Sequence, residues 1–176
     1  MEAWIIPVNT PVSAHISRQP FVDTFIRKMN GGSQSCLVGA SDNRFYIVKL
    51  ADNPQGPNVL FNEALGALLA GYLKLPVPEW RPLNLTEGFI SQNPGFWFDE
   101  CGKTRPPKPG LHFGSLVVTG SEQREVYEVL PCRWMERIRK PELLVGILLL
   151  DIWAENVDRR QMLFIERPHT KSLDPL

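Results

Sequence analysis

Two patterns of hydrophobic and polar positions stand out along this chain. One is typical of β-strands, over residues 33–50, and the other has the period of a helix, over residues 59–73. Residues 33–39 and 44–50 contain apolar and β-branched residues on either side of the turn Ser41-Asp42-Asn43, which predicts a β-hairpin. Residues 59–73 predict a helix that ends before two prolines, with Glu63 pointing away from its apolar stripe. Small alanines lie beside Glu63, so we expect another element to approach that face closely. The stripe comprises Phe61, Leu65, Leu68, Leu69 and Tyr72, and the alanines are Ala67 and Ala70.

Shorter signals fill the rest of the chain. The first dozen residues predict a strand or an extended arm, and residues 15–30 predict a short helix around Phe21, Phe25 and Ile26. Residues 93–110 are rich in proline and glycine, which predicts an irregular insertion. The apolar run near 143–150 predicts a buried helix over about 141–156. Further strands are predicted at 79–91, 112–118, 126–130 and 162–165, and a short helix at 134–139.

The order of these elements predicts the fold class. A hairpin, a helix, more strands and a final helix indicate an α+β protein with an antiparallel sheet, followed by the start of a helical lobe. We assign residues 1–130 to the first lobe, with the irregular insertion near 93–111, and residues 131–176 to an incomplete second lobe. Alternation of parallel strands and helices is weak, which disfavours a Rossmann-type sheet.

Composition narrows the classes of function. The 176 residues are 43% apolar and 22% charged, as in globular proteins, and 19 basic residues balance 19 acidic ones, so nothing signals nucleic-acid binding. Three cysteines without a CxxC pair predict buried, reduced thiols rather than disulfides or a zinc site. The N-terminus lacks a signal-peptide pattern, and the longest apolar run is short of the roughly 20 residues that span a bilayer. We therefore expect a cytoplasmic protein without a membrane segment.

The candidate chemistry begins with a glycine pair, a lysine and a glutamate in that order. The phosphates of a nucleotide need backbone donors, a cation, and an anion that holds the flexible cation in place. Gly31 and Gly32 with Ser33 and Gln34 supply the first, Lys49 at the end of a predicted strand the second, and Glu63 the third. Each feature alone is an ordinary turn, a solvated lysine or an exposed glutamate. Their order predicts a nucleotide site.

A second cluster follows the last predicted helix. Asn156 and Asp158 lie between that helix and the next predicted strand, where a kinase keeps the carboxylate that accepts the proton of a substrate hydroxyl. The alternative is a structural loop in which Asn156 caps the helix and Asp158 pairs with an arginine. His112 also has two interpretations: it approaches the nucleotide or orders the insertion, or hydrogen bonds satisfy it in a packed loop.

Together these motifs resemble the HipA-like kinase family, over roughly residues 20–166. The resemblance implies a protein-kinase-like fold and ATP- and Mg²⁺-dependent phosphoryl transfer to a hydroxyl of a protein or small molecule. It implies a phosphate loop at Gly31, Gly32, Ser33 and Gln34, a phosphate-binding Lys49 paired with Glu63, a catalytic base at Asp158, and a hinge near 128–131. The resembling segments are 29–35, 46–49, 53–56, 60–63, 73–78, 109–115, 151–153 and 156–161.

The chain also departs from the family pattern. Leu163 stands where such kinases carry an asparagine that holds Mg²⁺, so Gln161 is the substitute ligand and Asp174 the remaining metal candidate. The family's last helices are missing, so we expect a truncated chain whose apolar helix at 143–150 lacks cover and either lowers stability or associates with a protein partner or itself. Three alternatives stay open: an active kinase, a nucleotide- or partner-binding pseudokinase, and an interaction module with a structural ion pair.

Overall fold

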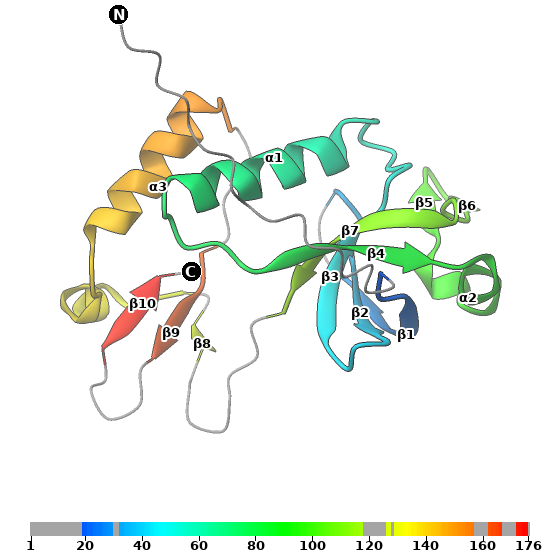
Figure 1. The fold of residues 1–176 in the computed structure, drawn as a ribbon, viewed down its shortest axis with the longest axis horizontal. Coiled ribbons are helices and arrows are strands. Elements are labelled where there is room, and N and C mark those ends of the chain that lie inside the picture. The colour runs from blue at the N-terminus through cyan, green and yellow to red at the C-terminus, as the bar shows by residue number, and fades with distance from the viewer. Residues whose placement is uncertain are drawn as a thin grey trace, which may run out of the picture.

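A curled antiparallel sheet forms the larger part of the molecule. The computed structural model describes residues 19–29, 32–117, 126–127, 129–156, 162–166 and 172–175. One face of the sheet is crossed by α1 (Val59–Tyr72), which contacts the strand next to the edge (Figure 1). The strands lie in the order β1 (Val22–Lys28), β2 (Cys36–Ala40), β3 (Phe45–Lys49), β7 (Gly110–Leu116) and β4 (Trp80–Leu85). The predicted α+β class, the hairpin formed by β2 and β3, and the helix α1 are confirmed.

The two outer strands of this sheet meet at one end. Phe21, just before β1, forms a parallel bridge with Asn84 of β4, and the Asn84 amide donates to the Pro20 carbonyl at 2.9 Å. The contact turns an open sheet into a partial barrel. It also satisfies backbone groups that an open edge would leave exposed.

The helix predicted around residues 15–30 is wrong where the structure describes that segment, because residues 22–28 form β1. The pairing register of β1 with β2 shifts between Val22 and Thr24 and again between Phe25 and Arg27. Such bulges add residues to one strand and break the alternation of inward and outward side chains. The apolar residues then fall at a spacing that resembles a helix. The arm predicted before this segment lies outside the described residues.

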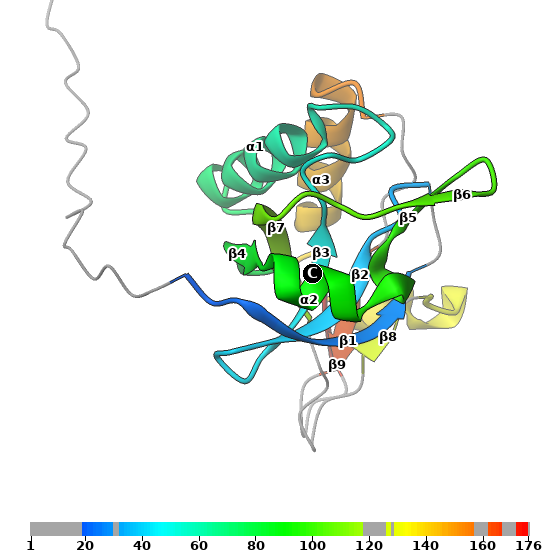
Figure 2. The ribbon, with the colours of Figure 1, turned by 90° about the vertical axis from the view of Figure 1, so that its right-hand side faces the viewer.

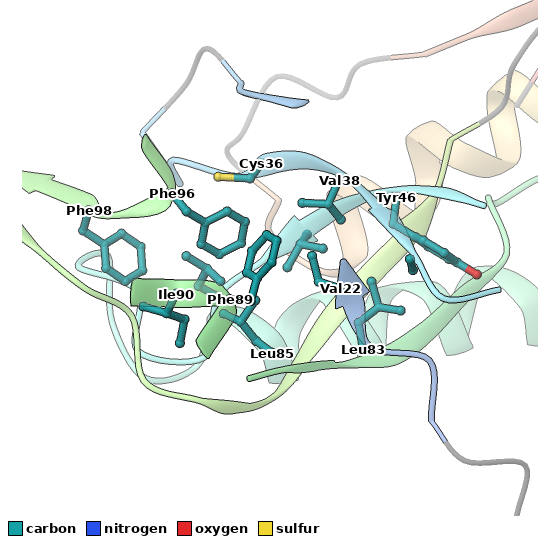
Figure 3. Close-up of a cluster of buried hydrophobic side chains, with 13 residues drawn as sticks. Val22, Cys36, Val38, Tyr46, Leu83, Leu85, Phe89, Ile90, Phe96 and Phe98 are labelled. Carbon is teal, nitrogen blue, oxygen red and sulfur yellow. The ribbon is translucent and has the colours of Figure 1, made fainter. Parts of the chain in front are cut away.

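The main core fills the inside of the curled sheet. Inward residues of β2 and β3 alternate with outward ones, and α2 (Glu87–Gln92) with the short helix η1 (Pro94–Phe96) closes one end (Figure 2). Two aromatic rings and an isoleucine from this closing segment point toward the strand residues (Figure 3). The cluster contains Val22, Cys36, Val38, Ala40, Tyr46, Val48, Leu50, Leu83, Leu85, Phe89, Ile90, Phe96 and Phe98.

Two further expectations need correction in this region. The strand signal over 79–91 ends at Leu85, and α2 follows because the Thr86 hydroxyl accepts the Phe89 amide at 3.2 Å and caps the helix. The segment 93–110 is not wholly irregular, since η1 and a hairpin of β5 (Phe98–Glu100) and β6 (Lys103–Arg105) form within it. Phe96 and Phe98 are fully buried and anchor this segment in the core.

A smaller cluster lies apart from the main sheet (Figure 1). Ile138, Phe164 and Leu173 are buried there. Its sheet contains β8 (Val126–Tyr127), β9 (Phe164–Glu166) and β10 (Leu173–Pro175), and its helices are η2 (Cys132–Arg137) and α3 (Glu142–Trp153). The division into two lobes at residue 130 stays a prediction. So does the helical character of the second lobe.

Both long helices carry exposed apolar side chains. Most of the stripe predicted on α1 faces outward, with Phe61 65% exposed and Tyr72 81% exposed. The expectation that α3 is a buried helix is wrong for the described chain, because only Ile147 and Leu150 of that helix are buried. Its exposed apolar residues are Val145, Leu148, Leu149, Ile152 and Trp153.

The thiols also differ in part from expectation. All three cysteines are free, as expected, but only Cys36 is buried, whereas Cys101 and Cys132 are exposed. Burial raises the pKa of the Cys36 thiol to about 11, which keeps it protonated. Within the described segments, no helix combines the length and apolar character needed to cross a membrane.

The close approach of β4 to β7 depends on Gly114. A Cβ atom at this position would lie 2.5 Å from Leu83 Cδ1 and 2.7 Å from Leu83 Cγ. We expect Gly114→Ala to lower the free energy of unfolding by about 1–3 kcal/mol through overpacking, measured by urea denaturation. Gly66→Ala is the matched control, because nothing lies within 4 Å of its Cβ position in α1, and it should stabilise by up to about 1 kcal/mol. Equal stability of wild type and Gly114→Ala would contradict this packing.

Association through the exposed face of α3 also stays a prediction. We expect the sedimentation coefficient of the wild-type chain to rise with concentration. Leu149 is 60% exposed, so Leu149→Lys should remove that rise without unfolding the chain. A concentration-independent mass for the wild type would show that this face does not mediate association.

Candidate functional site

The ion pair predicted between β3 and α1 is present. Val48 and Leu50 are fully buried on the inner face of the curled sheet, so the alternation of β3 directs Lys49 to the opposite face, where α1 lies. The Lys49 Nζ atom donates to Glu63 Oε1. The two side chains are 27% and 33% exposed, so water still reaches both partners.

Small residues on α1 permit this contact. Glu63, Ala67 and Ala70 follow one another at helical spacing, and Ala70 is only 4% exposed. In the neighbouring strand, Phe113 stands opposite Lys49 and is 7% exposed. The expectation that another element approaches the alanine face is confirmed.

The glycine-rich turn lies next to the end of β3. Cys36 pairs with Val48, so the residues that precede Cys36 lie beside Lys49. The Met29 amide donates to the Ser35 carbonyl at 2.8 Å and closes the base of the turn. Gly32, Ser33 and Gln34 are described, whereas Gly31 lies outside the described residues.

Gln34 braces this turn from one side. Its backbone is left-handed, with φ at 47°, a conformation that costs about 1–2 kcal/mol for a residue other than glycine. Its side-chain Nε2 donates to the Asp99 carbonyl at 2.7 Å, and its Oε1 accepts the Asp99 amide at 2.8 Å. Lys28 Nζ also donates to Gln34 Oε1 at 3.0 Å. The amide of Gln34 is thus occupied by the β5–β6 hairpin.

Asn53 braces the same turn from the other side. It is 5% exposed, and its Nδ2 donates to the Ser33 carbonyl at 2.7 Å. Its Oδ1 accepts the Gln55 amide at 2.9 Å, an Asx-type turn that shapes the loop between β3 and α1. The end of the Gln55 side chain reaches Gly32, where an added Cβ would lie 2.8 Å from Nε2.

A third contact joins the two bracing segments to each other. Arg105 of β6 donates to the Asp52 carboxylate and, at 2.8 Å, to the Asp52 carbonyl. The same guanidinium binds Glu100 at 2.9 Å and lies 4.8 Å from the centre of the Phe98 ring. Sequence reasoning assigned no role to Asp52, Asn53 or Arg105. The available signals were the turn composition of residues 53–56 and their place among the segments that resemble the family.

His112 is held by hydrogen bonds on both ring nitrogens. Nδ1 accepts the Ala51 amide at 3.0 Å, which leaves Nε2 to donate to the Lys108 carbonyl at 3.1 Å. The ring is 3% exposed and holds the backbone just after Lys49. Burial lowers the pKa of His112 from its ordinary 6.5, against the opposing effects of the Lys108 carbonyl and the Asp52 charge. His112 is therefore satisfied by hydrogen bonds, as one interpretation held, but it lies in β7 rather than in a loop. Its bond to Lys108 also ties it to the segment 93–111, in agreement with part of the other interpretation.

The second predicted cluster is described only in part. Asp158 and Gln161 lie outside the described residues, between α3 and β9. Asn156 binds back to Asp151 through its amide and its side chain, each at 2.9 Å, and so closes the end of α3. This contact agrees with one part of the structural alternative, in which Asn156 caps the helix.

Of the two metal candidates, only Asp174 lies within the described residues. Asp174 belongs to β10, where it pairs with Ile165, and its Oδ1 lies 4.0 Å from Arg139 Nε. Lys49 belongs to the larger sheet. In the segments that the structure describes, no group of three or more His, Cys, Asp or Glu side chains is arranged to hold a metal ion.

An antiparallel sheet with one helix that offers a glutamate to a lysine of β3 is the architecture of a kinase-like N-lobe. A family model of HipA-like kinases matches residues 22–164, which is most of the chain, and the chain belongs to the HipA-like kinase family. This match confirms the family that the sequence motifs indicated. Searches among curated proteins and among solved structures returned no significant match.

The buried His112 predicts a pH-dependent stability. Its folded pKa is below the unfolded value of about 6.5, so the unfolded chain binds a proton first as the pH falls. The free energy of unfolding should therefore be independent of this group above pH ~6.5 and fall below it, by up to about 1.4 kcal/mol per pH unit. Urea denaturation between pH 7.5 and 5.5 measures the slope.

His112→Asn is the matched variant, because Asn Oδ1 can still accept the Ala51 amide but does not titrate. The difference in stability between wild type and variant should shrink as the pH falls. Parallel pH profiles for the two proteins would contradict a neutral, buried His112.

Proposed function

We propose that this chain binds ATP with Mg²⁺ and transfers a phosphoryl group to a hydroxyl of a protein or small molecule. The observation that supports the proposal is the Lys49–Glu63 pair beside a braced glycine-rich turn. A fixed ammonium next to a held glycine-rich turn suits phosphate, because neither component must be ordered when the ligand binds. Membership of the HipA-like kinase family agrees with this chemistry.

Each proposed residue has a distinct role. Lys49 neutralises phosphate charge while Glu63 holds its ammonium, and the backbone amides of Gly31, Gly32, Ser33 and Gln34 face the phosphate oxygens. Asp158 accepts the proton of the attacking hydroxyl. Carboxylate and amide oxygens suit Mg²⁺, so Asp174 and Gln161 are the proposed ligands, and the metal neutralises charge on the phosphates when bound.

A second candidate function is nucleotide or partner binding without transfer. Leu163 favours it, because a leucine side chain cannot coordinate a metal where family members carry an asparagine. Under either function we place the protein in the cytoplasm, where ATP is abundant and free thiols persist.

The test combines binding with turnover. Calorimetry with Mg²⁺-ATP measures binding, and release of labelled γ-phosphate to the chain or to added acceptors measures transfer. Lys49→Ala should weaken transfer on the order of 100-fold or more, through loss of charge stabilisation in the transition state. Asp158→Asn should remove transfer while ATP affinity stays close to that of the wild type.

Lys103→Ala is the control, because Lys103 is an exposed lysine on β6. It should leave both measurements unchanged. ATP binding without transfer supports the second function. If ATP does not bind to the wild-type chain, the ion pair is structural only, and both phosphoryl transfer and nucleotide binding are rejected.

A further inference from the structure

We propose that Asn53 and Gln34 are positioning residues that hold the glycine-rich turn in its phosphate-binding shape before the nucleotide arrives. This inference rests on the proposed function. It assigns a role to Asn53, which the motif chemistry left without one. It also changes the role of Gln34, whose side chain faces the protein rather than a ligand.

The Asn53 contact fixes one peptide of the turn. A buried side-chain amide donates to the Ser33 carbonyl at 2.7 Å, and because a peptide group is planar this bond sets the plane between Ser33 and Gln34. Asn53 is itself held, since its Oδ1 accepts the Gln55 amide and its carbonyl accepts the Gly56 amide at 3.0 Å. The loop therefore presents Asn53 in one orientation.

The Gln34 contact fixes the other end of the turn. Its left-handed backbone is unfavourable for a residue with a side chain, and glutamine has no intrinsic preference for it. Its amide exchanges two hydrogen bonds with the Asp99 backbone, and Lys28 adds a third. The side-chain bonds thus hold a backbone conformation that the sequence alone would not adopt.

The segments that hold Asn53 and Gln34 are also joined to each other. Asn53 belongs to the loop after β3, Asp99 belongs to β5, and the Arg105–Asp52 contact joins these two segments. A turn held in this way loses little conformational entropy when phosphates bind. Removing either side-chain contact should therefore weaken the binding of ligands that contain the phosphates. The binding of a ligand that lacks them should not change.

The test compares ATP with adenosine on the full chain by calorimetry, with adenosine measured by displacement of ATP. Asn53→Ala removes the donor to Ser33. Gln34→Gly removes the brace but suits the left-handed backbone, so this variant should fold with an almost unchanged melting temperature. We expect each variant to weaken Mg²⁺-ATP binding by about 10-fold or more, because Asn53→Ala removes one positioning hydrogen bond and Gln34→Gly removes three, with adenosine affinity unchanged.

Asn93→Ala is the matched control, because Asn93 Nδ2 also donates to a backbone carbonyl, that of Phe89, at 2.8 Å. It should leave the ratio of ATP to adenosine affinity at the wild-type value. If adenosine binds too weakly to measure, loss of ATP affinity in Gln34→Gly at an unchanged melting temperature supports the proposal.

Two results overturn the inference in different ways. If wild-type chain binds ATP and both variants bind it equally well, the braces are structural only, and the proposed function stands. If both variants lose ATP and adenosine affinity in the same proportion, the effect is general and the positioning role is rejected. Failure of the wild type to bind ATP would instead remove the proposed function itself.

Discussion

The ion pair between Lys49 and Glu63 depends on the close packing of α1 against the larger sheet, and the candidate site depends on that pair. A lysine on the outer face of β3 can reach a carboxylate only if the helix lies close to the sheet, and Ala67 and Ala70 make that approach possible. Water still reaches the pair, so its free energy alone is modest, roughly 1 kcal/mol or less. Its importance is geometric, since it holds the Lys49 ammonium beside the glycine-rich turn.

The surroundings of this pair are built from segments far apart in the sequence. The turn before β2, the loop after β3 and the β5–β6 hairpin meet through Gln34, Asn53 and Arg105. His112 adds a fourth segment by holding the Ala51 backbone. Side-chain amides, a guanidinium and an imidazole thus do what regular secondary structure cannot do for irregular loops, which is to satisfy backbone groups and fix their direction.

The sequence predicted those features that depend on local periodicity. The β2–β3 hairpin, the helix α1 and the position of Glu63 beside small residues all follow from spacing within a few turns. The features that were missed depend on partners distant in the chain. The bulges of β1 follow from its pairing with β2, and the hairpin at 98–105 depends on Phe96 and Phe98 filling a core made by other strands.

The candidate site divides in the same way. Lys49 and Glu63 could be paired from their order, because a strand followed by a helix has few ways to pack. The role of Asn53 could not be predicted, because an asparagine in a turn satisfies its own loop as readily as a neighbouring one. The close approach to the alanine face was expected, but the exposure of the apolar stripe was not, because an apolar stripe of helical period usually faces the core.

The seam between Phe21 and Asn84 has a consequence for how the chain reaches this structure. Strands β1 and β4 are the two edge strands of the sheet, and they are far apart in the sequence. Their contact therefore closes a long loop, and this closure costs chain entropy. The β2–β3 hairpin needs no such closure and can form early. We therefore expect the barrel shape to be acquired late in folding and the native sheet to open first at this seam.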